Sequence, residues 1–326
     1  MKRNYSRRAV VVALFGSVAT GIFADAPLTS LRPMGRPQKA GAITPEMRVP
    51  LIDVIRASGV TGRVSAVLAD ATTGEIIDSS DGNEPLPPAS VTKVVTALYA
   101  LEFLGPDFQF ETRVFADSPI LDGILDGNLI LAGGGNPNLV TDDLAQLATR
   151  LKDSGLTAVR GKFYVYDGAL PNLDEIDESQ LDQSGYNPAI SGLNLNFNRV
   201  HFEWQREGGA YTVMLDARSI NFRPAVTFAK MRIVDRSVPV YTYRDGGGLD
   251  EWTVARGALG SGGSRWLPVR YPALYAGEVF AGFARGHDIA LTSASEIALP
   301  PQAAPIAIHK SVSLHRMMQE MLRFST

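Results

Sequence analysis

One segment, residues 87–98, constrains the fold more than any other, because a rigid turn in it runs directly into an apolar helical stretch. Its sequence is PPASVTKVVTAL. The two prolines interrupt any regular element before them, and the residues that follow are compatible with a helix. Ser90 is therefore expected at the beginning of this helix, and Lys93 one turn further along.

The spacing of Ser90 and Lys93 suits nucleophilic catalysis. Residues three positions apart share a helix face. A serine hydroxyl is a weak nucleophile until a nearby base takes its proton, and a neutral lysine can be that base. The partial positive charge at a helix N-terminus disfavours the ammonium form. We therefore predict that Ser90 is a nucleophile and Lys93 its base. The alternative is that Ser90 only caps the helix, although a capping box has Glu or Gln where Lys93 stands.

The composition narrows the possible functions. The chain has 326 residues, 45% of them hydrophobic and 20% charged, with a net charge of -3. This length allows two domains, and the charge gives no reason to expect nucleic acid as a partner. The absence of cysteine excludes thiol nucleophiles, disulfides and cysteine ligands. The four histidines are scattered without zinc-site spacing, so no metal and no cofactor is predicted.

The N-terminus has the features of an export signal. A basic start precedes an apolar run at 9–24, which is short for a membrane span, and a small-x-small cleavage pattern follows. We expect an export signal at 1–26, a linker at 27–43, and a periplasmic protein without a stable membrane span after signal removal. The arginine pair before the run suggests the twin-arginine route. A membrane anchor is the alternative.

Local patterns predict a mixed α/β fold of the α+β type. Alternation and turn residues predict strands at 63–70, 75–78, 108–114, 128–132 and 161–167, and mostly strands from 199 to 256, with 200–205 and 211–215 as the clearest hairpin. Helices are predicted after Thr44, from Ser90 to Gly105, after a cap at Thr141 or Asp142, and from 311 to the end. The region 105–299 is thus β-rich with one helix.

The last predicted helix carries a third candidate residue. Its apolar residues, from Leu314 to Leu322, recur with the spacing of one buried face. Ser325 lies about three turns after Leu314, at roughly 3.6 residues a turn, and continues this face if the helix extends that far. A polar residue that closes an apolar face is a candidate site residue. A serine without function near a helix end is the alternative.

Four segments of the sequence carry a combined pattern: 88–93 (PASVTK), 129–139 (LILAGGGNPNL), 186–196 (YNPAISGLNLN) and 321–326 (MLRFST). Together they resemble the low-molecular-mass class C penicillin-binding proteins, the D-alanyl-D-alanine carboxypeptidase/endopeptidases. They follow the family's order between about residue 45 and the end of the sequence.

The resemblance implies a penicillin-binding/β-lactamase-like serine transpeptidase domain, made of residues 44–104 and 300–326, with a large β-rich insertion at 105–299. It implies an acyl-transfer enzyme that acts on peptidoglycan stem peptides ending in D-Ala-D-Ala and is acylated by β-lactam antibiotics. Ser90 would be the acylated nucleophile and Lys93 its base, and the Ser90 N–H would supply half of the oxyanion hole. Ser325 would begin the family's Ser-x-Asn motif.

The sequence departs from this family near its end. The asparagine of Ser-x-Asn would follow Thr326, and no Lys-Thr-Gly motif occurs; the literal Ser-x-Asn at 219–221 lies in the β-rich region. We therefore expect a C-terminally truncated chain that lacks the C-terminal part of its sheet and has little or no peptidase activity. The alternatives are a non-catalytic cell-wall binding or sensing protein on the same fold and a β-lactamase-type hydrolase.

Overall fold

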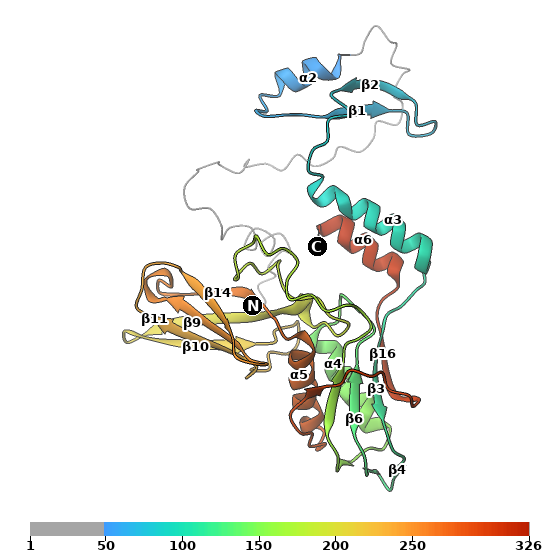
Figure 1. Ribbon diagram of the computed structural model, residues 1–326, viewed down its shortest axis with the longest axis vertical. Coiled ribbons are helices and arrows are strands. Elements are labelled where there is room, and N and C mark those ends of the chain that lie inside the picture. The colour runs from blue at the N-terminus through green and yellow to red at the C-terminus, as the bar shows by residue number, and fades with distance from the viewer. Residues whose placement is uncertain (1–48, 326) are drawn as a thin grey trace, which may run out of the picture. The chain divides into compact units, whose positions relative to one another are not determined.

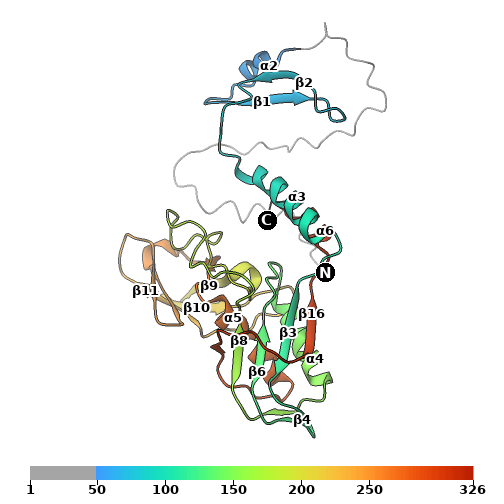
Figure 2. The same cartoon turned by 45° about the vertical axis from the view of Figure 1, so that its right-hand side comes forward.

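The computed structural model describes residues 49–325 (Figures 1 and 2). The predicted export signal at 1–26, the linker at 27–43 and the helix cap at Thr44 lie outside the described residues. Two compact units follow one another along the chain, with the division between Pro87 and Pro88.

The N-terminal unit contains a short helix and a hairpin. Its elements are α2 (Leu51–Ala57), β1 (Ala66–Ala69) and β2 (Ile76–Ser80). The two strands are antiparallel, which confirms the predicted hairpin. The Asp70 carboxylate holds the turn, because it accepts the backbone N–H groups of Thr72 and Thr73, both at 2.8 Å. An aspartate that binds the backbone of its own turn in this way is a signal for a turn that can be read from the sequence.

A five-stranded mixed sheet forms the centre of the larger unit, with the order β15-β8-β6-β3-β16. Its strands are β3 (Glu111–Ala116), β6 (Leu129–Ala132), β8 (Phe163–Tyr166), β15 (Ser295–Glu296) and β16 (Pro305–Lys310). All four residues of β6 are buried, as a continuous apolar run in a central strand should be. β16 pairs with β3, so the sheet joins residues on both sides of the predicted boundary at 299. The domain boundaries themselves stay predictions.

Two helices, α4 (Thr141–Asp153) and α5 (Pro272–Gly286), pack against each other and against this sheet (Figure 1). The prediction of one helix in 105–299 is therefore wrong, because α5 is a second one. Nine of its fifteen residues are buried, so it lacks the polar face that identifies an amphipathic helix in a sequence. Its close approach to β8 depends on Gly277, where an added Cβ would lie 2.7 Å from Val165 Cγ1.

The start of α4 differs from the prediction. Val140 is the N-cap, and Thr141 is already the first helical residue, so the expected cap at Thr141 or Asp142 is wrong. The Asp143 carboxylate instead accepts the Val140 N–H at 3.0 Å. The Thr141 hydroxyl is buried and donates to the Ala217 carbonyl at 2.8 Å. The Thr141 hydroxyl therefore does not cap the helix, because it bonds a carbonyl 76 positions further along the chain.

The larger unit contains further strands outside the central sheet. They form the sheets β10-β9-β14, β11-β13-β12 and β4-β5-β7. The strands are β4 (Ile120–Leu121), β5 (Ile124–Leu125), β7 (Ala158–Val159), β9 (Arg199–Glu207), β10 (Ala210–Asp216), β11 (Ala229–Val234), β12 (Tyr241–Asp245), β13 (Asp250–Ala255) and β14 (Gly262–Pro268). β9 and β10 form the hairpin predicted at 200–205 and 211–215. One hydrophobic core joins these sheets to α4 and α5.

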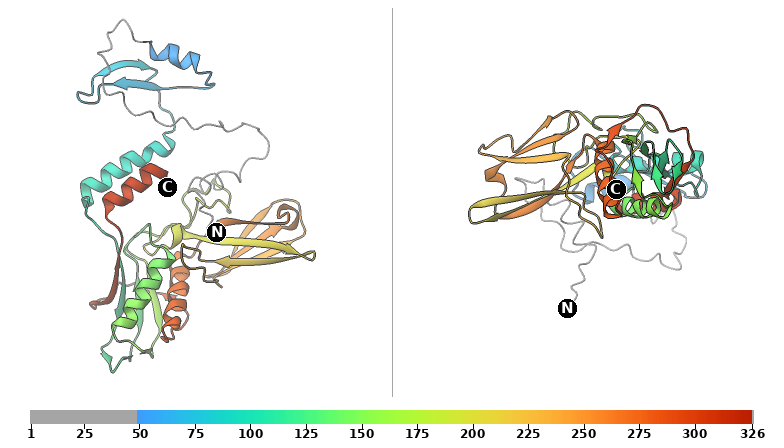
Figure 3. Two further views of the ribbon diagram at one scale, coloured as in Figure 1. Left: turned by 180° about the vertical axis from the view of Figure 1, so that it is seen from behind. Right: turned by 90° about the horizontal axis from the view of Figure 1, so that it is seen from below.

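The remaining helices, α3 (Thr92–Leu104) and α6 (Leu314–Phe324), lie side by side (Figures 1 and 3). α3 leads into β3, and β16 leads into α6, so the strand pairing and the helix pairing involve the same two stretches of chain. The predicted mixed α/β class is confirmed. Within residues 49–325, none of the helices has the length and apolar character that crossing a membrane requires.

Candidate active site

Ser90 lies where a tight turn becomes a long helix. The 3₁₀ turn η2 (Ala89–Val91) leads directly into α3, and α3 ends at Gly105 with a φ of 82°, as the glycine stop predicted. Ala89 has a φ of 46°, a left-handed value that costs an L-residue about 1–2 kcal/mol. The fold therefore holds the backbone beside Ser90 in a conformation that an isolated peptide rarely adopts.

Ser90 and Lys93 contact each other as their spacing predicts. The Lys93 Nζ donates a hydrogen bond to the Ser90 Oγ at 3.1 Å. Val91, not Ser90, is the N-cap of α3, and no side-chain capping bond forms there. The alternative that Ser90 merely caps the helix is therefore wrong. No acidic residue lies in the first turn of α3 to neutralise Lys93 locally.

Ser325 reaches the same place from the other end of the unit. Its Oγ donates to the Ser90 Oγ at 2.8 Å. α6 ends at Phe324, and Ser325 is a left-handed C-cap with φ 54° and ψ 40°. The expectation that Ser325 continues the buried helix face is wrong, because the chain leaves the helix first and the residue is exposed. The turn at the helix end, and not the helical repeat, directs its hydroxyl to Ser90.

Hydrogen bonds around Ser311 set the position of α6 relative to α3. The Ser311 N–H donates to the Phe110 carbonyl at 2.9 Å, and the Phe110 N–H donates to the Ser311 Oγ at 3.0 Å. The Leu314 N–H donates to the Phe108 carbonyl at 2.8 Å. These bonds continue the β3–β16 pairing into the segments that follow α3 and precede α6. The register of one strand pair therefore helps to place Ser325, the residue that follows α6, next to Ser90.

The three side chains make the Ser90 Oγ the acceptor of two hydrogen bonds. An oxygen with two donors, one of them a lysine amine, tolerates a developing negative charge better than an isolated hydroxyl does. The distance between the Ser90 Oγ and the Lys93 Nζ, 3.1 Å, lies within the range over which a proton can pass between a nucleophile and its base. This arrangement is chemically suited to acyl transfer through Ser90.

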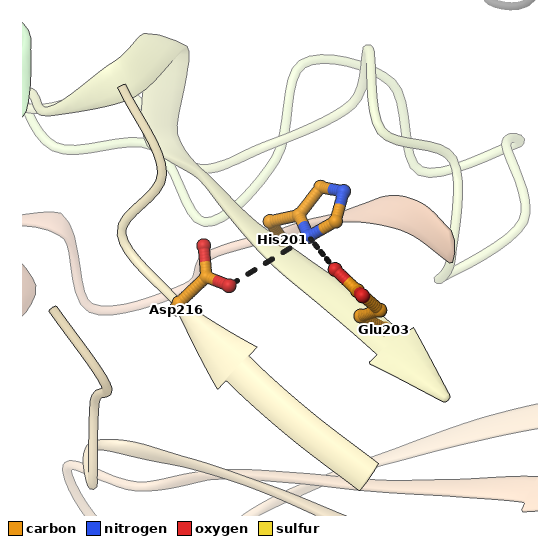
Figure 4. A group of neighbouring side chains, drawn as sticks. All are labelled: His201, Glu203 and Asp216. Atoms are coloured by element: carbon orange, nitrogen blue, oxygen red, sulfur yellow. Dashed lines mark ion pairs between the residues drawn. The ribbon is translucent and has the colours of Figure 1, made fainter. Parts of the chain in front are cut away.

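Among the described residues, one group of three potential metal ligands also comes together: His201, Glu203 and Asp216 (Figure 4). His201 and Glu203 lie two positions apart on β9 and share a face, and His201 is paired with Asp216 of β10. The sequence gives no sign of this group, because no other histidine lies near His201 along the chain. The hairpin register, which follows from a two-residue turn, is the signal that could have identified this group.

Arg218 already supplies the positive charge in this group. One of its terminal nitrogens lies 2.5 Å from Glu203 Oε2 and 2.9 Å from Asp216 Oδ2. The His201 Nδ1 lies 3.9 Å from both carboxylates, which is too far for a hydrogen bond. Burial, together with the nearby Arg218, lowers the pKa of His201. The group is therefore an ion-pair network beside a neutral histidine, and a metal ion would have to displace the guanidinium.

Comparisons with known proteins identify the family of this chain. The sequence profile of the D-Ala-D-Ala carboxypeptidase 3 (S13) family matches residues 51–326. The D-alanyl-D-alanine carboxypeptidase of an Actinomadura species is 36% identical over 160 residues, which is 48% of this chain and 30% of that protein. The D-alanyl-D-alanine carboxypeptidase DacB of Haemophilus influenzae is 35% identical over 98 residues, which is 30% of this chain and 20% of that protein.

Solved structures show the same fold. Penicillin binding protein 4 of Haemophilus influenzae matches with a TM-score of 0.61, at 21% identity, over 78% of this chain and 57% of that one. Its complex with a β-lactam matches with a TM-score of 0.63, at 19% identity, over 84% of this chain and 60% of that one. These matches confirm the predicted penicillin-binding fold, and this chain spans less than two thirds of each relative. The profile match over residues 51–326 shows that the chain belongs to the D-Ala-D-Ala carboxypeptidase 3 (S13) family.

Proposed function

We propose that this protein is a serine-type D-Ala-D-Ala carboxypeptidase/endopeptidase that acts on peptidoglycan peptides and is acylated by β-lactams. One observation carries the proposal: the Ser90 Oγ lies 3.1 Å from the Lys93 Nζ and 2.8 Å from the Ser325 Oγ. Family membership supports the same reaction class. We assign Ser90 as the nucleophile, Lys93 as its general base, and Ser325 as the hydroxyl that donates to the nucleophile.

The proposed reaction proceeds through an ester on Ser90. A neutral Lys93 amine takes the Ser90 hydroxyl proton, and the Ser90 oxygen attacks the carbonyl carbon of the penultimate D-Ala. The carbon–nitrogen bond to the terminal D-Ala then breaks, and the leaving amine takes up a proton from Lys93, with the Ser325 hydroxyl next to the path. Water attacks the ester, releases the shortened peptide and restores Ser90. The Ser90 N–H is one donor to the oxyanion formed in each step.

A β-lactam would follow the first half of this reaction. The Ser90 oxygen attacks the lactam carbonyl, the ring carbon–nitrogen bond breaks, and the amine stays attached to the acyl group. Because that amine cannot diffuse away, the ester should last long enough to be detected. A long-lived acyl-enzyme also distinguishes this proposal from a β-lactamase-type hydrolase, which would release the opened antibiotic rapidly.

Covalent labelling by a fluorescent penicillin tests the assignment. The protein purified from its natural gene should carry the label after denaturation and should release D-Ala from a peptide ending in D-Ala-D-Ala. Ser90→Ala should lose both signals. Ser313→Ala is the matched control, because Ser313 precedes the opposite end of α6 and makes no side-chain capping bond. Labelling that survives in Ser90→Ala contradicts the site assignment, and wild-type protein that binds the peptide without label or turnover supports the non-catalytic alternative.

We further propose that the protein works in the periplasm after removal of residues 1–26. The basic start, the short apolar run and the small-x-small pattern of the sequence support this location. N-terminal sequencing of the protein recovered from the periplasmic fraction should begin near Pro27. Recovery of the uncleaved chain in the membrane fraction would instead support the anchor reading.

A further inference from the structure

A pocket of about 300 Å³ lies outside the candidate active site that Ser90, Lys93 and Ser325 form. It is formed where the start of α4, the η3 turn (Asn196–Asn198), β9 and β14 meet, together with the loop that contains Ile220. Ser90, Lys93 and Ser325 do not line it. The volume is at the lower end of the range for small-molecule sites, and corresponds to a ligand of one or two amino acids.

Arg199 contacts two aromatic rings that line this pocket. Its guanidinium carbon lies 5.2 Å from the centre of the Phe197 ring and 5.4 Å from that of Trp266. Such cation–π contacts orient a guanidinium without using its N–H groups. Phe197 has a left-handed backbone, with φ 58° and ψ 31°, which places its ring there at a cost in backbone energy. The fold therefore presents Arg199 in a fixed orientation.

The Arg199 guanidinium has no acidic partner among residues 49–325. Its Nε is buried and makes no hydrogen bond, and no carboxylate compensates the charge. A guanidinium has five N–H donors, and burying it unpaired is costly. Burial lowers the pKa of Arg199, which reflects this uncompensated cost. A polar group left unpaired at such a cost needs an explanation, and a ligand that completes the pair is one.

The other charged groups that line the pocket are already paired. The Asp142 carboxylate accepts the N–H groups of Ile220 and Asn221, at 3.1 and 3.3 Å. The Arg218 guanidinium is bound to the carboxylates of Glu203 and Asp216, as described above. Among the charged side chains that line this pocket, Arg199 is therefore the one without a hydrogen-bond partner within residues 49–325.

We propose that this pocket binds the free carboxylate of a small peptide or acylated amino acid, with Arg199 as the residue that recognises the carboxylate. Arginine and carboxylate form paired, charge-assisted hydrogen bonds, and cation–π contacts with the two rings use none of the guanidinium N–H groups. The apolar side chains of Val140, Phe197, Ile220 and Trp266 offer a surface for the apolar body of the ligand. The proposal is independent of the proposed acyl-transfer activity.

Binding of N-acetyl-leucine, compared with that of N-acetyl-leucinamide, tests the proposal. The complete Ser90→Ala protein is used, so that the candidate active site takes no part in covalent chemistry. We expect the carboxylate to bind in calorimetry and to shift the Arg199 Nε–H resonance in NMR. The amide should bind at least about 10-fold more weakly, because it cannot form the charged pair. Equal binding of both compounds overturns the proposal.

Two substitutions separate recognition from folding. Arg199→Gln should weaken N-acetyl-leucine binding at least about 10-fold, whereas Arg206→Gln should not change it. Arg206 is the matched control, because it lies on the same strand, with its guanidinium 5.8 Å from the Tyr211 ring, and does not line this pocket. Unchanged binding in Arg199→Gln overturns the proposal.

Ile220→Glu keeps the test decisive if Arg199→Gln does not fold. Ile220 is 95% exposed, so the substitution leaves the core intact and adds a negative charge at the pocket rim. It should weaken carboxylate binding at least about threefold by like-charge repulsion. Binding unaffected by this charge overturns the proposal, as does binding of inorganic phosphate at Arg199 when N-acetyl-leucine does not bind.

Discussion

The Ser325 hydroxyl donates a hydrogen bond of 2.8 Å to the Ser90 hydroxyl, although the two residues are 235 positions apart in the sequence. Ser90 is placed by the turn before α3, and Ser325 by the left-handed residue that ends α6. The pairing of β3 with β16 brings these helices together. The contact therefore depends on the register of a sheet that contains neither residue.

Ser325→Ala should slow acylation of Ser90 by penicillin about 10- to 100-fold, because it removes a donor to an oxygen that becomes charged during attack. The free energy of unfolding should change by less than about 0.5 kcal/mol, since Ser325 is exposed. Rapid-quench labelling measures the rate, and Ser313→Ala is the control. An acylation rate equal to that of the wild type would falsify the proposed role of Ser325.

Lys93→Arg and Lys93→Ala should both reduce acylation about 100- to 10,000-fold, because neither side chain can take the Ser90 proton. Arginine keeps the positive charge near Ser90 but stays protonated at any accessible pH. The pair of variants therefore separates the role of a base from that of a charge. If Lys93→Arg is acylated nearly as fast as the wild type, Lys93 contributes through its charge alone.

Ser311→Ala should destabilise the larger unit by about 1–3 kcal/mol and also slow acylation. The substitution leaves the Phe110 N–H without the partner that it has at 3.0 Å in a partly buried setting. The position of α6 depends on this contact, so Ser325 should lose its fixed distance from Ser90. Urea unfolding and the labelling rate measure the two effects. Lower stability with an unchanged acylation rate would show that Ser311 does not help to position Ser325.

Gly277→Ala should destabilise the protein by about 1–3 kcal/mol through overpacking. The new Cβ would lie 2.7 Å from both Val165 Cγ1 and Ala294 Cβ, so α5 would have to move away from β8. Gly282→Ala on the same helix is the control. Apart from its chain neighbours and the backbone of its own helix, no atom lies within 4 Å of the Cβ position of Gly282, and alanine should stabilise the helix by about 0.5–1 kcal/mol. Urea unfolding should therefore show effects of opposite sign, and equal effects would contradict the close packing of α5.

Asp250→Asn should remove a pH dependence of stability. Burial raises the pKa of the Asp250 carboxyl to about 6, against the opposing effect of hydrogen bonds from the Arg270 N–H and the Tyr243 hydroxyl. Between about pH 4 and 6 the folded state holds a proton that the unfolded state has lost. Stability contributed by this group is therefore present at low pH and is lost as pH rises through 6, by about 3 kcal/mol in total.

Urea unfolding from pH 4.5 to 7 checks this prediction. The difference in free energy of unfolding between wild type and Asp250→Asn should change by about 2 kcal/mol over this range, with the wild type relatively more stable at the acidic end. Other groups titrate in both proteins, so their contributions to the free energy of unfolding cancel in the difference. Parallel stability profiles would contradict the raised pKa of Asp250.

The elements that local patterns predicted correctly are those whose signals lie within a few residues of one another. The β1–β2 turn contains an aspartate that binds its own backbone, and α3 ends at the glycine that its sequence indicates. The β9–β10 hairpin follows from a two-residue turn between alternating strands. The Ser90–Lys93 contact belongs to the same class, because a helical turn by itself makes these residues neighbours.

The predictions that were wrong depended on partners far along the chain. The second helix of the region 105–299, α5, is buried on most sides, so it has no polar face to reveal its helical period. The expected cap at Thr141 or Asp142 failed because the Thr141 hydroxyl bonds the Ala217 carbonyl instead. The helical repeat indicated that Ser325 would continue a buried face, but the chain leaves the helix at Phe324.

By itself the sequence indicated the family, because four motifs occur in the family's order along the chain. It also indicated the contact of Ser90 with Lys93 and the local hairpins, because these depend on short-range geometry that repeats wherever the same residues occur. The tertiary structure decided three further features: the contact of Ser325 with Ser90, the charge network around His201, and the unpaired Arg199 in contact with two rings. Each of these joins segments separated along the chain, and their relative positions depend on strand register and core packing, which no local pattern encodes.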